Sequence, residues 1–497
     1  MIPALAATLA IVVQDHTALR AAPRSGATEL TALWQGDVLE IRGQHAGYLK
    51  VYDYRRERGG YLRSEGVREV GLTEADAPAL LAVLRFLRES RGFEALGISY
   101  GAAYLKAVPA PALTAEPFAA IAGMAERLAD EASGAGPRRA DVAAHLEVVA
   151  QFGIRMRTFE RNGRIQVCYD GELFRRVLSL PGAGSEERAR AALALTRPDC
   201  IDPNAGPLAR ESVDEERREL LERIDEQGLS ALTKSLLHAR RATVWASVAY
   251  QHARRREPSG PAAWRALGEL LEVNAADLGA DRRAEYVDAV VRVGAIRWAA
   301  MTPAAPMGSL TLSATAGEPG QTCLTLADAQ RPGAEPLLRR CTYGVAWMAS
   351  AQTFAQGRAL ALAVQPLESW RELWVFHERA GSWTVDVLSP GVDDPQEGYV
   401  EFAGFAPGTR RLLIAREVKD QGRFRRFFEE RRLDDLALVR QAGAPELLND
   451  FGRWQGVAWR RDTLVTEARG GSGIELPPRG LHSTITTTFP RAWPFSR

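Results

Sequence analysis

Four cysteines carry the most definite chemistry in this sequence. They fall as one pair in the middle of the chain, Cys168 and Cys200, and a later pair, Cys323 and Cys341. None belongs to a C-x-x-C motif or has a histidine at zinc-finger spacing, which disfavours a metal site. Four cysteines allow three pairings, and locality favours the Cys168–Cys200 and Cys323–Cys341 disulfides. The alternative is four buried thiols, since cysteine often serves as a small core residue.

The other residue types that catalyse reactions do not form a known motif. No two of the seven histidines lie four residues apart, and the sequence contains no G-x-S-x-G, no P-loop and no S-x-x-K. We therefore predict no catalytic residue, no metal and no cofactor. The alternative is a Cys168 thiolate with His145 or His238 as its base.

Tyr48, Tyr52, Tyr54 and Tyr61 form a dense aromatic group. Residues two apart in a strand face the same side, so Tyr48, Tyr52 and Tyr54 share one face. Planar rings offer a ligand large contact area at little entropic cost. These three tyrosines are our predicted ligand-binding residues; the alternative is that two of the four rings point into the core.

Charge argues against a nucleic-acid partner, and hydropathy argues against a membrane-spanning helix. The formal net charge is +1 and the sequence pI is about 7.7, so no broad positive field collects nucleic-acid phosphates. No stretch approaches the roughly 18 to 20 apolar residues of a membrane-spanning helix. We predict no nucleic-acid partner and no membrane span.

The apolar start of the chain suggests export. Residues 4–6 read Ala-Leu-Ala, the small-x-small pattern of a signal-peptidase site. We predict that residues 1–7 are the remnant of a signal peptide; the alternative is an ordinary first strand. Together with the disulfides, which persist in oxidising compartments, this predicts a periplasmic or secreted protein.

Residues 8–71 alternate short apolar runs with glycine turns, as a small antiparallel barrel does. Reversals are expected at Gly36-Asp37, Gly43, Gly47 and Gly59-Gly60. A further set of residues occurs in a familiar order: Leu19-Arg20, Pro23, Gly36-Asp37, Val38, Tyr48-Leu49-Lys50-Val51 and Gly60-Tyr61. This order resembles the bacterial SH3 (SH3b) family, with Tyr48 where the family often has tryptophan. The resemblance implies an SH3-like barrel with a shallow aromatic groove for peptide or glycan.

From residue 72 to 300 the apolar period changes to that of helices, as Leu80, Leu84 and Leu87 illustrate. One helix is expected to start at Thr73 and to stop at Gly92. Others are expected at about 93–108, 114–133, 138–152, 170–180, 185–195, 212–227 and 229–256. A β-hairpin near 154–168, with its turn at Asn162-Gly163, interrupts this helical domain.

Residues 301–469 return to a period of two and predict a β-rich domain. Two rounds of about four strands, 344–397 and 398–452, weakly resemble β-propeller blades, and a third round is expected from Gly456. Leu360 and Leu362 should then match Leu412 and Ile414, all buried between sheets. Three blades are too few for a closed propeller, so a β-sandwich is the alternative. Residues 470–497 are expected to be a loosely ordered tail.

These features predict a multidomain α and β protein: an SH3-like barrel, an all-α middle domain with an inserted hairpin, and a C-terminal antiparallel β-meander that is propeller-like or a sandwich. The expected function is non-catalytic binding in the bacterial cell envelope. The SH3b-like module would recognise a peptidoglycan peptide or an envelope protein. The alternatives are an envelope hydrolase with its site in the helical domain and a purely structural scaffold. We also expect a fragment starting at Leu72 to behave well in solution.

Overall fold

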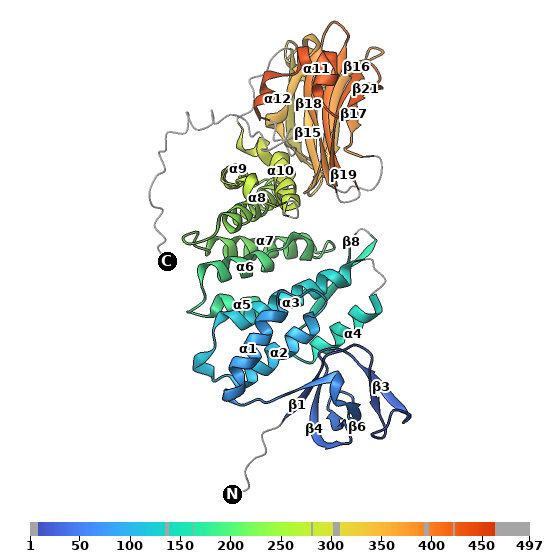
Figure 1. Cartoon of the computed structure of the whole chain (residues 1–497). Helices are drawn as coiled ribbons and strands as arrows, with labels where there is room; N and C mark the ends of the chain where they lie inside the picture. The colour runs from blue at the N-terminus through green and yellow to red at the C-terminus, as the bar shows by residue number, and fades with distance from the viewer. Residues whose placement is uncertain are drawn as a thin grey trace. The chain divides into compact units, whose positions relative to one another are not determined.

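The computed structural model describes residues 8–462, apart from 135–138, 162, 280–281, 302–308, 392–396 and 421–422. The chain is a mixed α/β protein with several antiparallel sheets (Figure 1). It divides into two compact units, Met1–Val213 with Glu219–Thr233, and Asp214–Arg218 with Lys234–Arg497. The predicted signal remnant (1–7) and tail (470–497) lie outside the described residues. The division into three domains stays a prediction, and each unit is described by itself.

The first unit begins with a seven-stranded antiparallel sheet in the order β3-β2-β6-β5-β4-β1-β7. One face carries the apolar residues of the alternating runs, among them Val12, Leu39, Leu49 and Val51, which are almost fully buried. The strand pairing forms an open path from β3 to β7 and does not close into a barrel. The strands are β1 (Leu9–Val12), β2 (Thr17–Arg20), β3 (Glu29–Leu33), β4 (Val38–His45), β5 (Tyr48–Asp53), β6 (Arg58–Arg63) and β7 (Val67–Val70).

The glycines of this sheet differ in role, and the predicted reversals are only partly right. Ala46 and Gly47 have φ values of 48° and 77° and form the two-residue turn between β4 and β5, where positive φ matches the twist of a hairpin. Gly43, in contrast, lies inside β4, and Gly59-Gly60 lies inside β6. A glycine within a strand often marks a bulge instead of a turn, which is the case beside Gly43.

The helical part of the first unit follows the predicted periodicity, although the helix expected at 212–227 spans Pro207–Glu222, five residues earlier. Helix α2 (Glu94–Ala107) and helix α3 (Ala115–Ser133) lie within one or two residues of the expected ranges, and the hairpin of β8 (Met156–Arg161) and β9 (Arg164–Tyr169) is confirmed. Asn162 of its turn is outside the described residues. The remaining helices are α1 (Ala77–Leu87), α4 (Arg139–Ala150), α5 (Glu172–Ser179), α6 (Ser185–Leu195) and α7 (Pro207–Glu222), the last of which contributes to both units.

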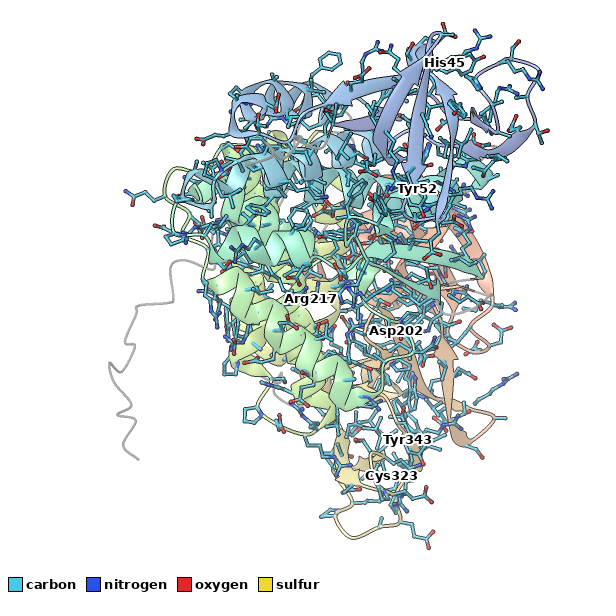
Figure 2. The ribbon with its side chains drawn as sticks, turned by 90° about the horizontal axis from the view of Figure 1, so that it is seen from below. His45, Tyr52, Asp202, Arg217, Cys323 and Tyr343 are labelled. Carbon is cyan, nitrogen blue, oxygen red and sulfur yellow. A yellow bond between two sulfur atoms is a disulfide. The ribbon has the colours of Figure 1, made fainter. Side chains whose placement is uncertain are left out.

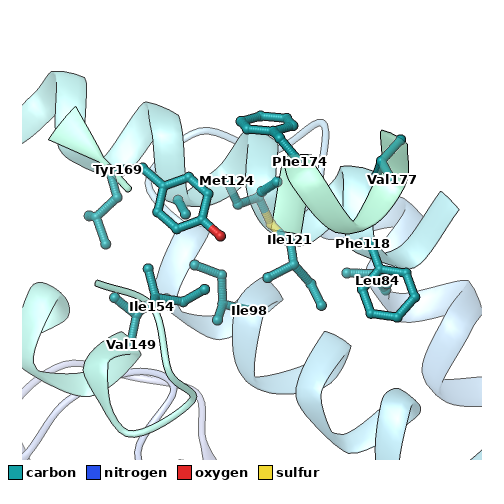
Figure 3. Close-up of a cluster of buried hydrophobic side chains, with 14 of the residues drawn as sticks. Leu84, Ile98, Phe118, Ile121, Met124, Val149, Ile154, Tyr169, Phe174 and Val177 are labelled. Carbon is teal, nitrogen blue, oxygen red and sulfur yellow. The ribbon is translucent and has the colours of Figure 1, made fainter. Parts of the chain in front are cut away.

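Two apolar clusters hold the first unit together. The larger one gathers side chains from α1 to α6 and the hairpin, including Ile98, Met124 and Phe174 (Figure 3). The second joins the sheet to the helices, because Ile11 of β1 and Val70 of β7 pack against Leu80, Leu87 and other residues of α1 and α2. Each fully buried leucine contributes about 1.5–3 kcal/mol to stability.

Helix α2 approaches α3 closely because it has glycines one turn apart. A Cβ at Gly97 would lie 2.4 Å from the Met124 sulfur, and one at Gly101 would lie 2.5 Å from Cγ1 of Ile121. Residues four apart share one helix face, so both glycines open the same side of α2 to α3. The cost of glycine inside a helix is offset here by this packing.

The second unit combines three longer helices with β-sheets. In Figure 1 these helices are the yellow-green elements and the sheets are yellow to orange. The helices are α8 (Ala231–Arg254), α9 (Gly260–Leu271) and α10 (Arg283–Ile296). A three-stranded sheet has β10 (Leu310–Ala316), β11 (Thr322–Asp328) and β12 (Leu338–Thr342). A nine-stranded sheet follows, with β13 (Val345–Ala346), β14 (Gln352–Phe354), β15 (Ala359–Leu367), β16 (Trp370–Arg379), β17 (Ser382–Leu388), β18 (Gly398–Ala406), β19 (Arg411–Asp420), β20 (Arg423–Arg432) and β21 (Leu438–Ala442).

The larger sheet divides at β16. Trp370 and Arg371 pair in parallel with β18, whereas Leu373–Arg379 pairs with β17. The part of the sheet with β15 and β16 is stacked face to face on the part with β18 and β19. This follows from the core cluster that Ala361 and Val375 share with Leu412 and Ile414. The opposite face of β15 carries Leu360 and Leu362, which pack against β10 and β11.

This layering bears on two details of the expected repeats. Leu360, Leu362, Leu412 and Ile414 are all buried between sheets, as predicted: the first two pack against β10 and β11, and the last two pack against β15 and β16. The expected third round at Gly456 is wrong, because this part of the chain forms the short helices α11 (Asn449–Trp454) and α12 (Val457–Asp462). Phe451 and Trp459 of these helices cover the outer face of β18 and β19.

Candidate functional site

The structure separates the three tyrosines that were predicted to bind a ligand. In β5, Leu49 and Val51 point into the sheet core, which places Tyr48 and Tyr52 on the other face. The Tyr48 side chain is only 8% exposed, with the Arg63 guanidinium 5.9 Å from its ring centroid. Tyr52 is half-buried, and Tyr54, just past the strand, is 65% exposed. The open aromatic surface is therefore made by Tyr52 and Tyr54, without Tyr48.

Arg42 completes this surface, although it was not among the predicted ligand-binding residues. Ile41 pairs with Val51 and Gly43 pairs with Lys50, so Arg42 is the extra residue of a β-bulge in β4. A bulge redirects the side chain of the extra residue. Here the Arg42 guanidinium lies over the Tyr52 ring, 4.0 Å from its centroid, and 6.0 Å from that of Tyr54. The signal in the sequence was the glycine directly after Arg42 within a strand.

A small polar network holds the four side chains in place. The Tyr52 and Tyr54 rings meet edge to face, with their centroids 5.0 Å apart. Glu40 accepts a hydrogen bond from Arg42 Nε at 2.7 Å and another from the Tyr54 hydroxyl at 3.0 Å. The hydrogen bonds from Arg42 and then from Tyr54 lower the pKa of Glu40, and Glu40 in turn raises the pKa of Arg42. We call Glu40, Arg42, Tyr52 and Tyr54 the N-terminal aromatic surface; Tyr52 is marked in Figure 2.

This surface can bind a flat or extended ligand. A guanidinium above a ring and a second ring at a right angle to it present a planar cation beside two aromatic faces. Such groups bind carboxylates, amides and sugar rings through hydrogen bonds and stacking. Because Glu40 already orders Arg42 and Tyr54, binding loses little side-chain entropy.

Both predicted disulfides are confirmed. Cys168 of β9 is bonded to Cys200, which follows α6, and their Cα atoms are 5.7 Å apart. Cys323 and Cys341 are cross-strand neighbours on β11 and β12 and form the second bridge. Since the Cys168 sulfur is in a disulfide, the alternative of a Cys168 thiolate nucleophile does not hold for this structure.

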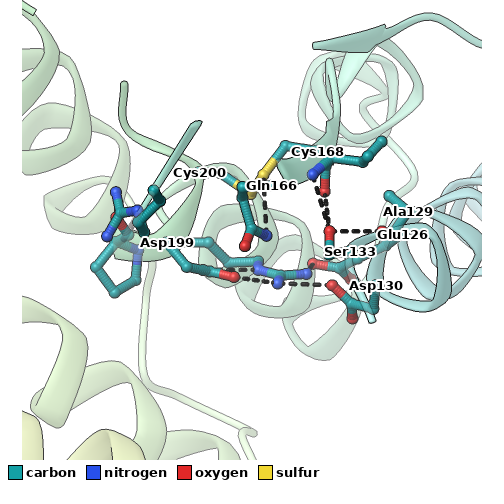
Figure 4. A network of polar contacts seen from close by, with 12 residues as sticks. Glu126, Ala129, Asp130, Ser133, Gln166, Cys168, Asp199 and Cys200 are labelled. Carbon is teal, nitrogen blue, oxygen red and sulfur yellow. Dashed lines mark hydrogen bonds and ion pairs between the residues drawn. A yellow bond between two sulfur atoms is a disulfide. The ribbon is translucent and has the colours of Figure 1, made fainter. Parts of the chain in front are cut away.

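The carboxylates that converge in the first unit surround an arginine. Arg197 binds Glu126 at 3.0 Å and Asp130 at 2.7 Å, and it also binds Asp199, next to the disulfide (Figure 4). Burial raises the pKa of Glu126. The adjoining cavity, lined by Glu126, Arg197 and Cys200 among others, measures about 30 Å³, which is room for a water molecule but not for a substrate.

A comparable arrangement occurs in the second unit, where three carboxylates surround Arg292. The distances are 2.8 Å to Asp288, 3.0 Å to Glu368 and 3.0 Å to Glu397. In both arrangements the carboxylates neutralise a guanidinium, as ion pairs inside a fold do. Among the described residues, no group of three or more histidine, cysteine, aspartate or glutamate side chains could hold a metal ion.

One histidine joins the N-terminal sheet to the helices. His145 of α4 hydrogen-bonds through Nε2 to Asp15 Oδ1 at 2.8 Å, and the backbone N–H of Gln35 donates to the same oxygen at 3.0 Å. The Trp34 ring lies edge-on to His145. Burial opposes ionisation of Asp15, but the hydrogen bonds from His145 and Gln35 and the charge of His145 together outweigh it, and the pKa of Asp15 is lowered. His145 therefore has a structural partner on the sheet.

Two further observations bear on the predicted location and partners. The disulfides are compatible with an oxidising compartment. No helix in the described ranges is long and apolar enough to cross a membrane. Comparisons of this chain with protein-family models, with curated proteins and with solved structures gave no match.

Proposed function

We propose that this protein is a non-catalytic binding protein of the bacterial cell envelope, periplasmic or secreted. Its N-terminal SH3-like module would contact a cell-wall peptide or an envelope protein through Arg42, Tyr52 and Tyr54. The observation that supports this most is the ordered, outward-facing stack of Arg42 on Tyr52 beside the exposed Tyr54 ring. Single exposed aromatic residues are common on proteins, but a cation and two rings ordered by one carboxylate form a specific recognition surface.

A purely structural role for the module is the second candidate. Tyr48 is buried, and Ile11 and Val70 of the sheet share an apolar cluster with α1 and α2. In that case the sheet stabilises the helices and the rings of β5 serve its own packing. This candidate predicts that changes at Tyr52 and Tyr54 lower stability, and that no ligand binds at these rings.

Co-sedimentation with purified peptidoglycan separates the two candidates. Full-length protein carrying Tyr52→Ala and Tyr54→Ala together should lose most of its retention, while its melting temperature changes little. Arg42→Gln should weaken retention as well, since it removes the cation and leaves both rings. Lys50→Ala is the matched control, because Lys50 is an exposed cation on the same strand and outside the stack.

Two results would count against the proposal. Retention that is equal in wild type and in all variants would show that this surface does not bind the cell wall, and a pull-down of envelope proteins with the same variants would then test the protein partner. Unfolding of the double variant, with normal retention by Arg42→Gln, would favour the structural role.

A further inference from the structure

A groove of about 240 Å³ opens in the second unit, separate from the N-terminal aromatic surface. Its lining comes from three segments: the C-terminal end of α8, the β10–β11 hairpin and the residues that follow β12. Two arginines, Arg254 and Arg256, line it together with Tyr343 and the hydroxyl-bearing Thr315 and Thr322. This volume suits a small ligand group, because typical drug-sized pockets are larger.

Both arginines donate to backbone carbonyl oxygens, and both are exposed residues. Arg254 donates through Nη1 to the carbonyl oxygen of Tyr343, and Arg256 donates through Nη2 to that of Gln321. Each guanidinium has five N–H donors, and both side chains belong to exposed residues. The donors that remain can bind an anion that enters the groove, and the fixed geometry reduces the entropy lost on binding.

Arg256 occupies a backbone position that favours glycine. Its φ is 62°, and the amides of Arg256 and Glu257 donate to the carbonyl oxygens of Ala253 and His252, respectively. This pattern is the Schellman motif that ends a helix, in which the left-handed residue is most often glycine because glycine has no Cβ to strain. An arginine here costs backbone energy and places its guanidinium at the groove. Strain of this kind often accompanies a functional role.

The segment after β12 forms another wall of the groove. Tyr343 follows β12 directly, its ring is 52% exposed, and its hydroxyl donates to Glu318 at 3.0 Å. The Cys323–Cys341 disulfide joins the two strands behind this wall, and Cys323 and Tyr343 lie near each other in Figure 2. The hydrogen bond to Glu318 also raises the pKa of Tyr343, so the hydroxyl stays protonated.

We propose that this groove binds a carboxylate of an acidic peptide, with Arg254 and Arg256 holding the carboxylate and the Tyr343 ring contacting the peptide backbone. Guanidinium groups match carboxylates in planar, two-pronged hydrogen bonds. The nearby Glu318 carboxylate favours a singly charged carboxylate over a doubly charged phosphate, because it repels the second negative charge. An extended chain also suits an open groove with a flat aromatic wall better than a compact ion does.

Isothermal titration calorimetry on the full-length protein tests this proposal. The probes are an N-acetylated, C-amidated heptapeptide with glutamate at three alternating positions, the same peptide with glutamine, and inorganic phosphate. We expect the glutamate peptide to bind, with an affinity that falls as salt rises, and the glutamine peptide to bind at least about tenfold more weakly. Equal binding of the two peptides, or phosphate binding as tight as that of the glutamate peptide, would refute it.

Variants assign the binding to the groove. Arg256→Gly relieves the positive φ, so the protein should stay folded while its affinity for the glutamate peptide falls about tenfold to a hundredfold. Arg254→Gln, which keeps the helix, should weaken binding by a similar factor. Arg331→Gln is the matched control, because it removes the same charge from an exposed arginine of this unit that does not line the groove. An equal loss in all three variants, or no loss in the first two, would overturn the proposal.

Discussion

Glu401 of β18 is a buried carboxylate that receives hydrogen bonds from three separate elements. Arg297, just after α10, donates at 2.6 Å, Arg371 of β16 donates to the same oxygen, and the Trp459 indole of α12 donates to the other at 3.0 Å. Burial alone would raise the pKa of Glu401, but the two guanidinium groups hold it well below its usual range. One carboxylate thus joins a helix end, two strands and the final helix.

Glu401→Gln should destabilise the second unit strongly. The substitution keeps the size of the side chain but leaves two buried guanidinium groups without their charge partner. Breaking a buried ion pair from one side typically costs about 3–5 kcal/mol. Urea unfolding followed by tryptophan fluorescence measures the loss, with the exposed Glu335→Gln as control. A loss as small as that of the control would mean that water or other groups solvate the arginines.

The Asp15–His145 contact should make stability depend on pH in the acid range. The pKa of Asp15 in the folded state lies below its ordinary value of 3.8. A carboxyl group with a lowered folded-state pKa contributes stability that is fully present above the unfolded value and is lost as the pH falls through the folded value. Asp15→Asn should therefore be less stable than wild type by about 1 kcal/mol at pH 7, since solvent partly screens this contact.

Urea titrations at pH 7, 5 and 3 check this expectation. The stability difference between Asp15→Asn and wild type should be smaller at pH 3 than at pH 5. Glu65→Gln, which changes an exposed carboxylate between β6 and β7, should show little difference at any of these values. A difference that grows from pH 5 to pH 3 would contradict the assigned direction of the shift.

At the scale of elements, the close approach of α2 and α3 depends on the missing side chain at position 101. Gly101→Ala should destabilise the first unit by about 1–2 kcal/mol, because overpacking against Ile121 exceeds the gain in helix propensity. Gly123→Ala, on α3, is the matched substitution: no atom lies within 4 Å of the new Cβ, so only the gain in propensity remains, up to about 1 kcal/mol. Thermal unfolding of both variants should show shifts of opposite sign.

Hydrophobic period predicted the elements whose two faces differ clearly. Helix α3 agrees with the prediction for this reason, whereas α2 is buried on nearly all sides and the β8–β9 hairpin was predicted from its Asn-Gly turn. In β15, the leucines alternate with Ala359 and Ala361. The hydrophobic pattern does not predict that the face with the alanines is buried. These alanines nevertheless pack against a second sheet, because small side chains allow sheets to approach closely. The number of stacked layers therefore could not be deduced from the sequence.

The candidate site was predictable in part for a similar reason. Alternation placed Tyr48 and Tyr52 on one face, which the structure confirms, but the burial of Tyr48 depends on neighbours from other strands, such as Arg63. Arg42 reaches the surface only because a bulge shifts the register of β4. A one-residue shift of this kind changes which face a side chain occupies, and strand propensity does not locate it.

At the scale of the molecule, the packing of the first unit changes one expectation from the sequence. A fragment that starts at Leu72 was expected to behave well, but it lacks Ile11 and Val70, which cover Leu80 and Leu87. We now expect this fragment to expose that apolar cluster, to bind the dye ANS and to elute as aggregates in size-exclusion chromatography. Elution as a monomer with cooperative unfolding would show that the helices do not need the sheet.

The two disulfides also limit how far the chain can be stretched. Each bridge lies within one unit, and the bridges enclose loops of 32 and 18 residues. An extended chain spans about 3.5 Å per residue, so the bridges withhold about 110 Å and about 60 Å of contour length from a pulling force. An oxidised chain held at both ends therefore has a shorter reach than a reduced one, and a reductant would lengthen it in two steps of unequal size.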